Sequence, residues 1–298
     1  MKIRSILGLT SSIFLSTSVL AQQDFSAVEI QTIDVADGLY MLVGQGGNIG
    51  LSVGSDGTFI IDTQFAPLSE KIQAAIRGAG GGDVEFVVNT HWHGDHTGGN
   101  QNFASTGATI VAHNNVTARM SVDQVREIFN QDIPASPAAA LPTITFPNRM
   151  TFHWNGNTVN VVHVDNAHTD GDSIVHFTEL NVFHMGDTFF NGNYPFVDVS
   201  SDGSLDGIIA AGENVLRRTN SATKIIPGHG ALATPDDLRT DLEVLRTVRE
   251  RIQSLIDQGR SEDQVVAANP TSEWDAAYGA GFMNPENFTR LVYQSLSR

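Results

Sequence analysis

The chain has 298 residues, a formal net charge of −16 from 33 acidic and 17 basic side chains, and no cysteine. The negative charge argues against a nucleic-acid-binding protein, because phosphates would be repelled. The lack of cysteine excludes disulfides and thiolate metal ligands, so stability must come from the core and bound ions. The length suits one large domain, and we expect a single domain over residues 22–298.

The N-terminus has the pattern of a secretory signal peptide. Lys2 and Arg4 precede a largely apolar segment, residues 6–20, and Val19-Leu20-Ala21 offers small residues for cleavage. The apolar segment is shorter than the roughly 20 residues that a membrane span requires. We therefore expect a leader over residues 1–21 and a periplasmic or secreted mature protein that does not bind the membrane. The alternative is a retained N-terminal anchor.

Short strands separated by glycine turns are predicted for the first part of the mature chain. Residues 29–34, 38–43, 49–53 and 58–62 form the expected strands, and Asp-Gly and Gly-Gly pairs between them are typical of an antiparallel meander. A helix over residues 69–77 leads to buried strands at 84–89 and 108–112. We expect a further helix over Asn114–Gln131, with Val122, Val125 and Phe129 on its inner face. Four prolines between residues 134 and 147 then predict an irregular segment.

The second half repeats this scheme. Strands are expected at residues 150–154, 158–164, 173–178, 181–185 and 224–226, with a helix at 205–218 before the last of them. Thr234 followed by Pro235 is a typical helix start, and it predicts a long packing helix that ends before Gly259. Two more helices are expected at residues 261–268 and 284–296. Two β-rich halves, each followed by a helix, predict two sheets face to face with helices outside.

The segment from Thr90 to His96 has the clearest chemical signal. It reads Thr-His-Trp-His-Gly-Asp-His and follows a predicted buried strand. Alternate residues of an extended segment point the same way, so His91 and His93 can hold one ion. Asp95 and His96 would then face a second ion. A single histidine is more often structural than a ligand, but three with an aspartate at this spacing favour a metal site.

This His-x-His-x-Asp-His signature resembles that of the metallo-β-lactamase superfamily. Three later segments resemble its remaining ligand positions in order, at residues 166–172, 182–187 and 225–230. The resemblance implies an α/β (α+β) fold, the four-layer αββα sandwich, and two zinc ions per chain. It assigns His91, His93 and His168 to one metal, Asp95, His96 and His229 to the other, and Asp187 as a bridging ligand.

Several other residues leave alternatives open. His163 is a rival to His168, although His168 has the neighbouring threonine and aspartate of the family pattern. Asp62 can fix the tautomer of a ligating imidazole or cap a helix ahead of Pro67. Tyr194 can donate to a developing oxyanion or be an ordinary loop aromatic. The remaining histidines are predicted to be structural or surface residues: His113, His153, His176 and His184. The loop over residues 45–48 matches a substrate-covering loop of the family, although turn chemistry alone also explains its glycines.

Hydrolysis is the reaction class that such a site predicts. Bound metal would activate water as a hydroxide nucleophile and polarise an acyl carbonyl, and Asp95 would orient the hydroxide or carry a proton to the leaving group. The expected partner is a small-molecule substrate, and no feature indicates an oligomeric state. Phe190 stands where cysteine-using lactamases place a lysine for the drug's carboxylate, which disfavours that route to β-lactam hydrolysis.

We therefore expect a periplasmic or secreted dinuclear zinc hydrolase, with β-lactams among its candidate substrates. One alternative is a thioesterase or lactonase of the same fold, similar to glyoxalase II or acyl-homoserine lactonases, although no glutathione-recognising tail is evident. A second alternative is a persulfide dioxygenase-like protein with a single iron. A zinc-binding protein with a closed site is the alternative that is not an enzyme.

Overall fold

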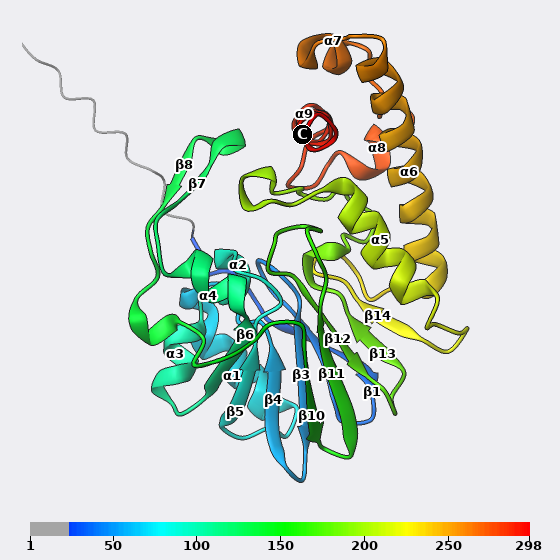
Figure 1. Ribbon diagram of the computed structural model, residues 1–298. Coiled ribbons are helices and arrows are strands. Elements are labelled where there is room, and N and C mark those ends of the chain that lie inside the picture. The colour runs from blue at the N-terminus through cyan, green and yellow to red at the C-terminus, as the bar shows by residue number, and fades with distance from the viewer. Residues whose placement is uncertain (1–23) are drawn as a thin grey trace, which may run out of the picture.

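The structure, a computed structural model, describes residues 24–298, so the expected leader over residues 1–21 lies outside the described part. Two β-sheets lie against each other in its lower part (Figure 1). The first sheet has seven strands in the order β1-β2-β3-β4-β5-β6-β9. Its first four strands form the predicted antiparallel meander, and its last four are parallel. The strands are β1 (Gln31–Ala36), β2 (Leu39–Val43), β3 (Ile49–Gly54), β4 (Gly57–Ile61), β5 (Val84–Val88), β6 (Thr109–His113) and β9 (Ile144–Phe146).

The second sheet has five strands in sequence order. Neighbouring strands are antiparallel except for the last pair, which is parallel because a helix connects its two strands. Its strands are β10 (Arg149–Trp154), β11 (Asn157–His163), β12 (Ser173–Phe177), β13 (Val182–His184) and β14 (Lys224–Ile226).

The central core lies between the two sheets. Side chains alternate along β4, so Phe59 and Ile61 face the second sheet while Ile60 faces the opposite way. Val161 and Val175 meet Phe59 and Ile61 from the second sheet, and all four are fully buried. Because this core is closely packed, truncating Phe59 to alanine would cost about 3–5 kcal/mol.

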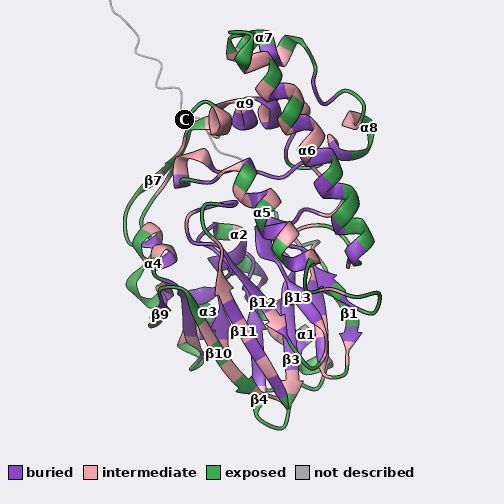
Figure 2. Ribbon diagram, turned by 45° about the vertical axis from the view of Figure 1, so that its right-hand side comes forward, coloured by how far each residue is buried: buried purple, intermediate pink, exposed green. Residues whose placement is uncertain are grey.

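Helices cover the outer face of each sheet. On the first sheet, α1 (Ser69–Gly78) and α3 (Asn100–Ser105) contribute Ile72, Ile76 and Phe103 to a second apolar cluster. On the second sheet, α5 (Leu205–Leu216) and α6 (Pro235–Asp257) enclose a third, which includes Phe183 and Ile225. The strands are largely buried between these layers (Figure 2). The protein is therefore a four-layer αββα sandwich, as predicted.

The C-terminal region extends this third cluster beyond the sandwich. The predicted cap of α6 is confirmed, because the Thr234 side chain accepts from Asp237 N and the Asp237 carboxylate accepts from the Thr234 backbone. Helices α7 (Glu262–Ala267), α8 (Asp275–Tyr278) and α9 (Pro285–Leu296) follow, and α9 lies beside α6 (Figure 1). The short α8 was not predicted.

The predicted helix over Asn114–Gln131 is wrong in its second half. Helix α4 (Asn114–Met120) stops after two turns, and β7 (Gln124–Arg126) pairs with β8 (Gln131–Ile133) in a separate antiparallel hairpin. The turn η2 (Glu127–Phe129) and the left-handed Asn130 connect them. Val122 and Val125 are 56% and 52% exposed, because the hairpin leaves the sandwich and no core lies behind them. The segment expected to be irregular contains the short edge strand β9, with Pro142 and Pro147 on either side.

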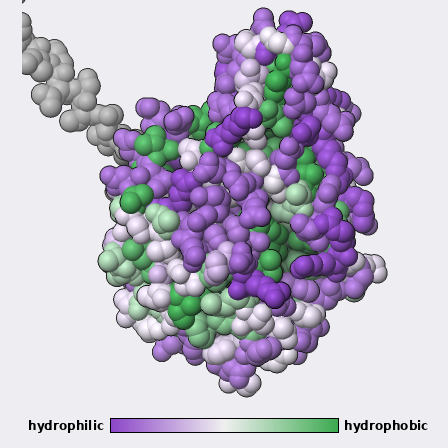
Figure 3. All heavy atoms as spheres, in the orientation of Figure 1, coloured by the Kyte–Doolittle hydropathy of each residue, from purple (hydrophilic) through white to green (hydrophobic). Residues whose placement is uncertain are grey.

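Hydrophilic residues dominate the face shown in Figure 3, and hydrophobic residues form narrow patches between them. None of the helices within residues 24–298 is both long and apolar enough to cross a membrane.

Candidate metal centre

Loops at one edge of the sandwich bring together the seven side chains that the sequence singled out. His91 and His93 follow β5, and Asp95 and His96 lie in the short helix α2 (Gly94–Thr97). The other three come from the second sheet: His168 from the loop after β11, Asp187 from the turn η4 (Gly186–Thr188) after β13, and His229 from the loop after β14. They form two groups whose donor atoms lie within 4.8 Å of one another: His91, His93, His168 and Asp187; and Asp95, His96 and His229.

Asp187 lies between the two groups. Its Oδ2 is 3.8 Å from His91 Nε2 and 3.5 Å from His168 Nε2, which belong to the first group. Oδ1 is 3.0 Å from His96 Nε2, and Oδ2 is 3.4 Å from His229 Nε2, so the same carboxylate also reaches the second group. This is the arrangement that a bridging carboxylate requires.

The donor set fits divalent metal ions. Imidazole nitrogens and carboxylate oxygens are the ligands that zinc uses when thiolates are absent. His91 Nε2 is buried and makes no hydrogen bond within residues 24–298, and the buried Asp187 Oδ1, although 3.0 Å from His96 Nε2, does not have hydrogen-bond geometry with it. Buried polar atoms without a partner are costly, and a cation in contact with both would remove that cost.

Hydrogen bonds hold the outer nitrogens of the histidines. His96 Nδ1 donates to Asp62 Oδ2 at 2.8 Å, and His93 Nε2 donates to Asp198 Oδ2 at 2.8 Å. His168 Nδ1 donates to the Phe196 carbonyl at 2.5 Å. Each bond leaves the other ring nitrogen free to face the centre. The tautomer role anticipated for Asp62 is therefore supported over the helix cap, whereas no local sequence pattern identified Asp198.

The two groups differ in their electrostatics. Burial disfavours the charged form of His96, but Asp187, Asp95 and Asp62 outweigh it and raise its pKa well above the usual value. Burial also opposes protonation of His229, yet Asp187 and Asp95 raise its pKa to about 9. In the first group, burial lowers the pKa of His93 to about 3, assisted by Arg126. The carboxylates thus concentrate negative potential on the side of His96 and His229.

Two glycines permit close approach to the cluster. A side chain on Gly47 would overlap the His96 ring, and one on Gly228 would overlap the Asp187 carboxylate. The Gly47 amide also donates to the Asp95 carbonyl at 3.2 Å, so the loop over residues 45–48 lies directly against the site. Turn chemistry alone does not account for Gly47.

His163 lies outside the cluster. Of the two histidines that the sequence offered as the third ligand of the first metal, the structure places His168 in the cluster. The His163 ring stacks on that of His113 at 3.7 Å, and His163 Nδ1 donates to the Asp172 carbonyl at 2.8 Å. His176 stacks on Phe183, and the buried His184 hydrogen-bonds to the Asn48 carbonyl. These histidines therefore have structural partners.

Tyr194 also points away from the cluster. Its hydroxyl donates to the Thr271 carbonyl and to Asp275, and its ring stacks on Phe288. The oxyanion role considered for Tyr194 has no support in this geometry.

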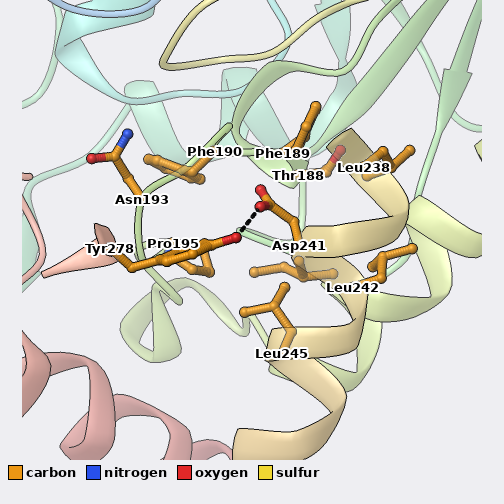
Figure 4. Close-up of a pocket in the computed structure, with 11 residues that line it drawn as sticks. Thr188, Phe189, Phe190, Asn193, Pro195, Leu238, Asp241, Leu242, Leu245 and Tyr278 are labelled. Carbon is orange, nitrogen blue, oxygen red and sulfur yellow. Dashed lines mark hydrogen bonds between the residues drawn. The ribbon is translucent and has the colours of Figure 1, made fainter. Parts of the chain in front are cut away.

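Phe190 forms a wall of the site. Its ring stacks on the His229 imidazole, with centroids 5.0 Å apart and planes 13° apart. The same residue lines a small pocket behind the site (Figure 4). In that pocket, the Tyr278 hydroxyl donates to the buried Asp241 carboxylate at 2.6 Å. The pocket is separate from the metal cluster, because none of the seven candidate ligands lines it.

The sequence pattern of the metallo-beta-lactamase superfamily matches residues 42–245, which hold all seven side chains. The chain belongs to this superfamily. A hydroxyacylglutathione hydrolase from Polaromonas sp. is 28% identical over 170 residues, or 55% of each chain. Another, from Erythrobacter litoralis, is 28% identical over 113 residues, 38% of this chain and 37% of that one. The alignments thus span about half or less of these relatives' length.

Solved structures share the fold. A metallo-beta-lactamase from Pontibacter korlensis has a TM-score of 0.60 at 18% identity, covering 73% of this chain and 99% of that one. The sec-alkylsulfatase Pisa1 from Pseudomonas sp. has a TM-score of 0.66 at 14% identity, covering 89% of this chain and 50% of that one. At such identities, the likeness concerns the fold alone.

Proposed function

We propose that this protein is a dinuclear zinc hydrolase of acyl bonds that acts in the periplasm or outside the cell. The observation that carries the proposal is the position of Asp187, whose two oxygens reach donor atoms of both groups. The all-nitrogen-and-oxygen donor set suits zinc, and the absence of cysteine excludes a thiolate nucleophile. The secreted location rests on the N-terminal sequence alone.

The chain's own residues supply orientation and proton transfer. Bound zinc would polarise the carbonyl and lower the pKa of water toward about 7. The Asp95 side chain is 23% exposed, against 5% for Asp187, so Asp95 is the carboxylate that substrate can reach. Asp95 Oδ2 lies 3.3 Å from His229 Nε2, which orients it. We assign to Asp95 the transfer of a proton from the attacking water to the leaving group.

Thioester hydrolysis is the second candidate. Both relatives described above are hydroxyacylglutathione hydrolases, whereas the likeness to the solved metallo-beta-lactamase from Pontibacter korlensis is one of fold. Phe190 also leaves no lysine at the position from which some lactamases bind the drug's carboxylate. A panel with a chromogenic cephalosporin, an acyl-homoserine lactone and a glutathione thioester, each with and without chelator, separates the substrate classes. No chelator-sensitive turnover of any of the three would refute the proposed function.

Metal content tests the proposal independently of substrate. Elemental analysis after gentle purification should find about two zinc ions per chain. One iron per chain without zinc would instead favour the persulfide dioxygenase alternative. Zinc without hydrolysis of any acyl substrate would favour a zinc-binding protein.

Asp187→Ala tests the bridging role. Because this carboxylate contacts both groups, its loss should lower metal content and activity together. His163→Ala is the control, since His163 lies in the same stretch of chain as His168 but outside the cluster. Loss of metal from His163→Ala with retention in His168→Ala would show that the ligand assignment is wrong.

A further inference from the structure

Arg126, on the hairpin strand β7, carries a guanidinium group with no counterion among residues 24–298. It makes no hydrogen bond and no ion pair within residues 24–298, and its Nε is buried. Two other partly buried arginines are paired: Arg119 with Asp170 at 3.0 Å and Arg251 with Glu273 at 2.8 Å. Arg126 as a whole is only partly buried, so its terminal nitrogens, which have no partner within the described residues, are available to an anion from outside the chain.

The guanidinium lies beside the metal centre. It is 5.5 Å from the centre of the Trp92 ring and 5.9 Å from that of Phe196. Both rings contact His93: Trp92 edge-on at 4.6 Å and Phe196 stacked at 5.5 Å. A single layer of aromatic rings therefore separates Arg126 from the candidate ligand His93.

Charged groups of the site face Arg126 at a distance. Burial lowers its pKa, while Asp95, Asp198 and Asp187 act in the opposite direction. None of the three carboxylates is close enough to form an ion pair with it, so its hydrogen-bonding capacity is not used by them.

The hairpin holds this position through aromatic contacts. Phe129, in the turn after β7, packs on Phe196 at 5.4 Å and on Phe282 at 5.1 Å. Phe282, just before α9, is 69% exposed. Figure 1 and Figure 2 both show the hairpin rising from the sandwich toward the C-terminal helices. Trp92 and Phe196 thus lie beside the cation, and Phe129 and Phe282 extend this apolar surface from Phe196.

We infer that Arg126 binds the carboxylate of an anionic substrate whose apolar body lies along Phe129 and Phe282, which pack on the buried Phe196. A guanidinium suits this role because it can donate two parallel hydrogen bonds to one carboxylate. The inference rests on the proposed acyl hydrolysis and narrows the substrates to those that carry a free carboxylate. Arg126 would supply the charge that Phe190 cannot.

Paired substrates that differ only in charge test this role. A chromogenic cephalosporin is compared with its carboxylate methyl ester on wild-type protein, Arg126→Gln and Arg126→Lys. Arg126→Gln should lower kcat/KM for the free acid roughly 10- to 100-fold, mainly by raising KM. It should lower kcat/KM for the methyl ester by less than about twofold. Arg126→Lys should retain part of the preference for the acid. A glutathione thioester, which also carries carboxylates, shows whether the acid preference extends to that class.

Arg251→Gln is the matched control. Arg251 also lies over an indole, that of Trp274 at 4.7 Å, but on α6 and outside the site. Its substitution removes the same charge and should leave the preference for the acid unchanged. An equal loss in Arg251→Gln would mean that net charge, rather than Arg126, selects the anion.

Calorimetric binding of hippurate and of hippurate methyl ester gives a measurement that needs no turnover. Arg126→Gln should weaken the binding of hippurate roughly 10- to 100-fold, as it does kcat/KM for the free acid, and leave the binding of the methyl ester unchanged. Equal weakening of both, with a lower Tm, would show that Arg126 only holds the hairpin in place. An unaltered preference for the acid would also overturn the inference. Selective loss of hippurate binding in a protein that hydrolyses no acyl substrate would uphold Arg126 and refute the proposed function.

Discussion

Asp62 binds His96 and Thr90 at once: its Oδ2 accepts from His96 Nδ1 at 2.8 Å, and its Oδ1 accepts from the Thr90 amide at 2.8 Å. The segment before the metal motif and one of the candidate ligands are therefore tied to one buried carboxylate. We expect Asp62→Asn to weaken metal binding in the group of His96 by about 10–100-fold, because the ligand loses its fixed orientation and basicity. Competition with a chromophoric chelator measures this. Equal losses in both groups would instead indicate general damage to the fold.

Asp198 offers the matched experiment on the first group. It accepts from His93 at 2.8 Å and is itself bound by Ser201 at 2.7 Å. Asp198→Asn should weaken the metal site of His93 and spare that of His96, the reverse of Asp62→Asn. Stepwise chelation, followed by elemental analysis, should therefore remove different ions first from the two variants. The same order of loss in both would contradict the assignment of two separate sites.

Gly47→Ala should disrupt the candidate metal centre by steric overlap alone, because the substitution does not change the charge. The added methyl group would overlap the His96 ring, so either the loop or the imidazole must move. We expect lower metal occupancy and at least a tenfold fall in kcat, since small displacements of catalytic groups are costly. Gly82→Ala is the control, because no atom lies within 4 Å of the position that its methyl group would take. Normal occupancy in Gly47→Ala would mean that the loop adapts freely.

The buried carboxyl group of Asp241, which lies outside the metal cluster, should make the stability of the protein depend on pH. Burial raises its pKa to about 7, assisted by Asp237 and opposed by hydrogen bonds from Tyr278 and Gly192. The folded state thus binds a proton that the unfolded chain releases near pH 4. The free energy of unfolding should fall as pH rises from about 4 to about 7, and change little from this group above that range.

Asp241→Asn keeps an oxygen for the Tyr278 hydroxyl but removes the charge. The variant should be more stable than wild type at pH 8, by an amount on the order of 1–3 kcal/mol, and should match it near pH 4. Urea unfolding of both proteins at pH 4 and at pH 8 measures this difference in the free energy of unfolding. A constant difference across the pH range would show that Asp241 does not titrate there.

The elements best predicted from sequence were those with a local signal. The strands up to β6 carry apolar runs bounded by glycine turns, and the His-x-His-x-Asp-His segment places four candidate ligands after one strand end. The later candidates could be found because each also follows a strand. Their convergence, however, depends on how the two sheets pack.

The sequence did not predict features that depend on contacts between segments far apart in the chain. The spacing of Val122, Val125 and Phe129 suggested a helix, but a helix needs a surface to pack on, and the chain leaves the sandwich after α4. Asp198 and Arg126 lie in segments without a recognisable motif. Only the folded chain shows that the first contacts His93 and that the second lies over Trp92.

The β7–β8 hairpin carries the proposed substrate-binding residue Arg126 on a segment apart from the candidate metal ligands. It lies between β6 and β9 in the sequence, and within the described part of the chain its two short strands pair only with each other. It contributes none of the seven candidate ligands. Mutations at its exposed positions can therefore change what the site accepts, whereas Phe129 packs on Phe196, whose carbonyl accepts from the candidate ligand His168. Directed evolution of substrate preference would therefore best begin with the exposed residues of this hairpin, such as Val122 and Val125.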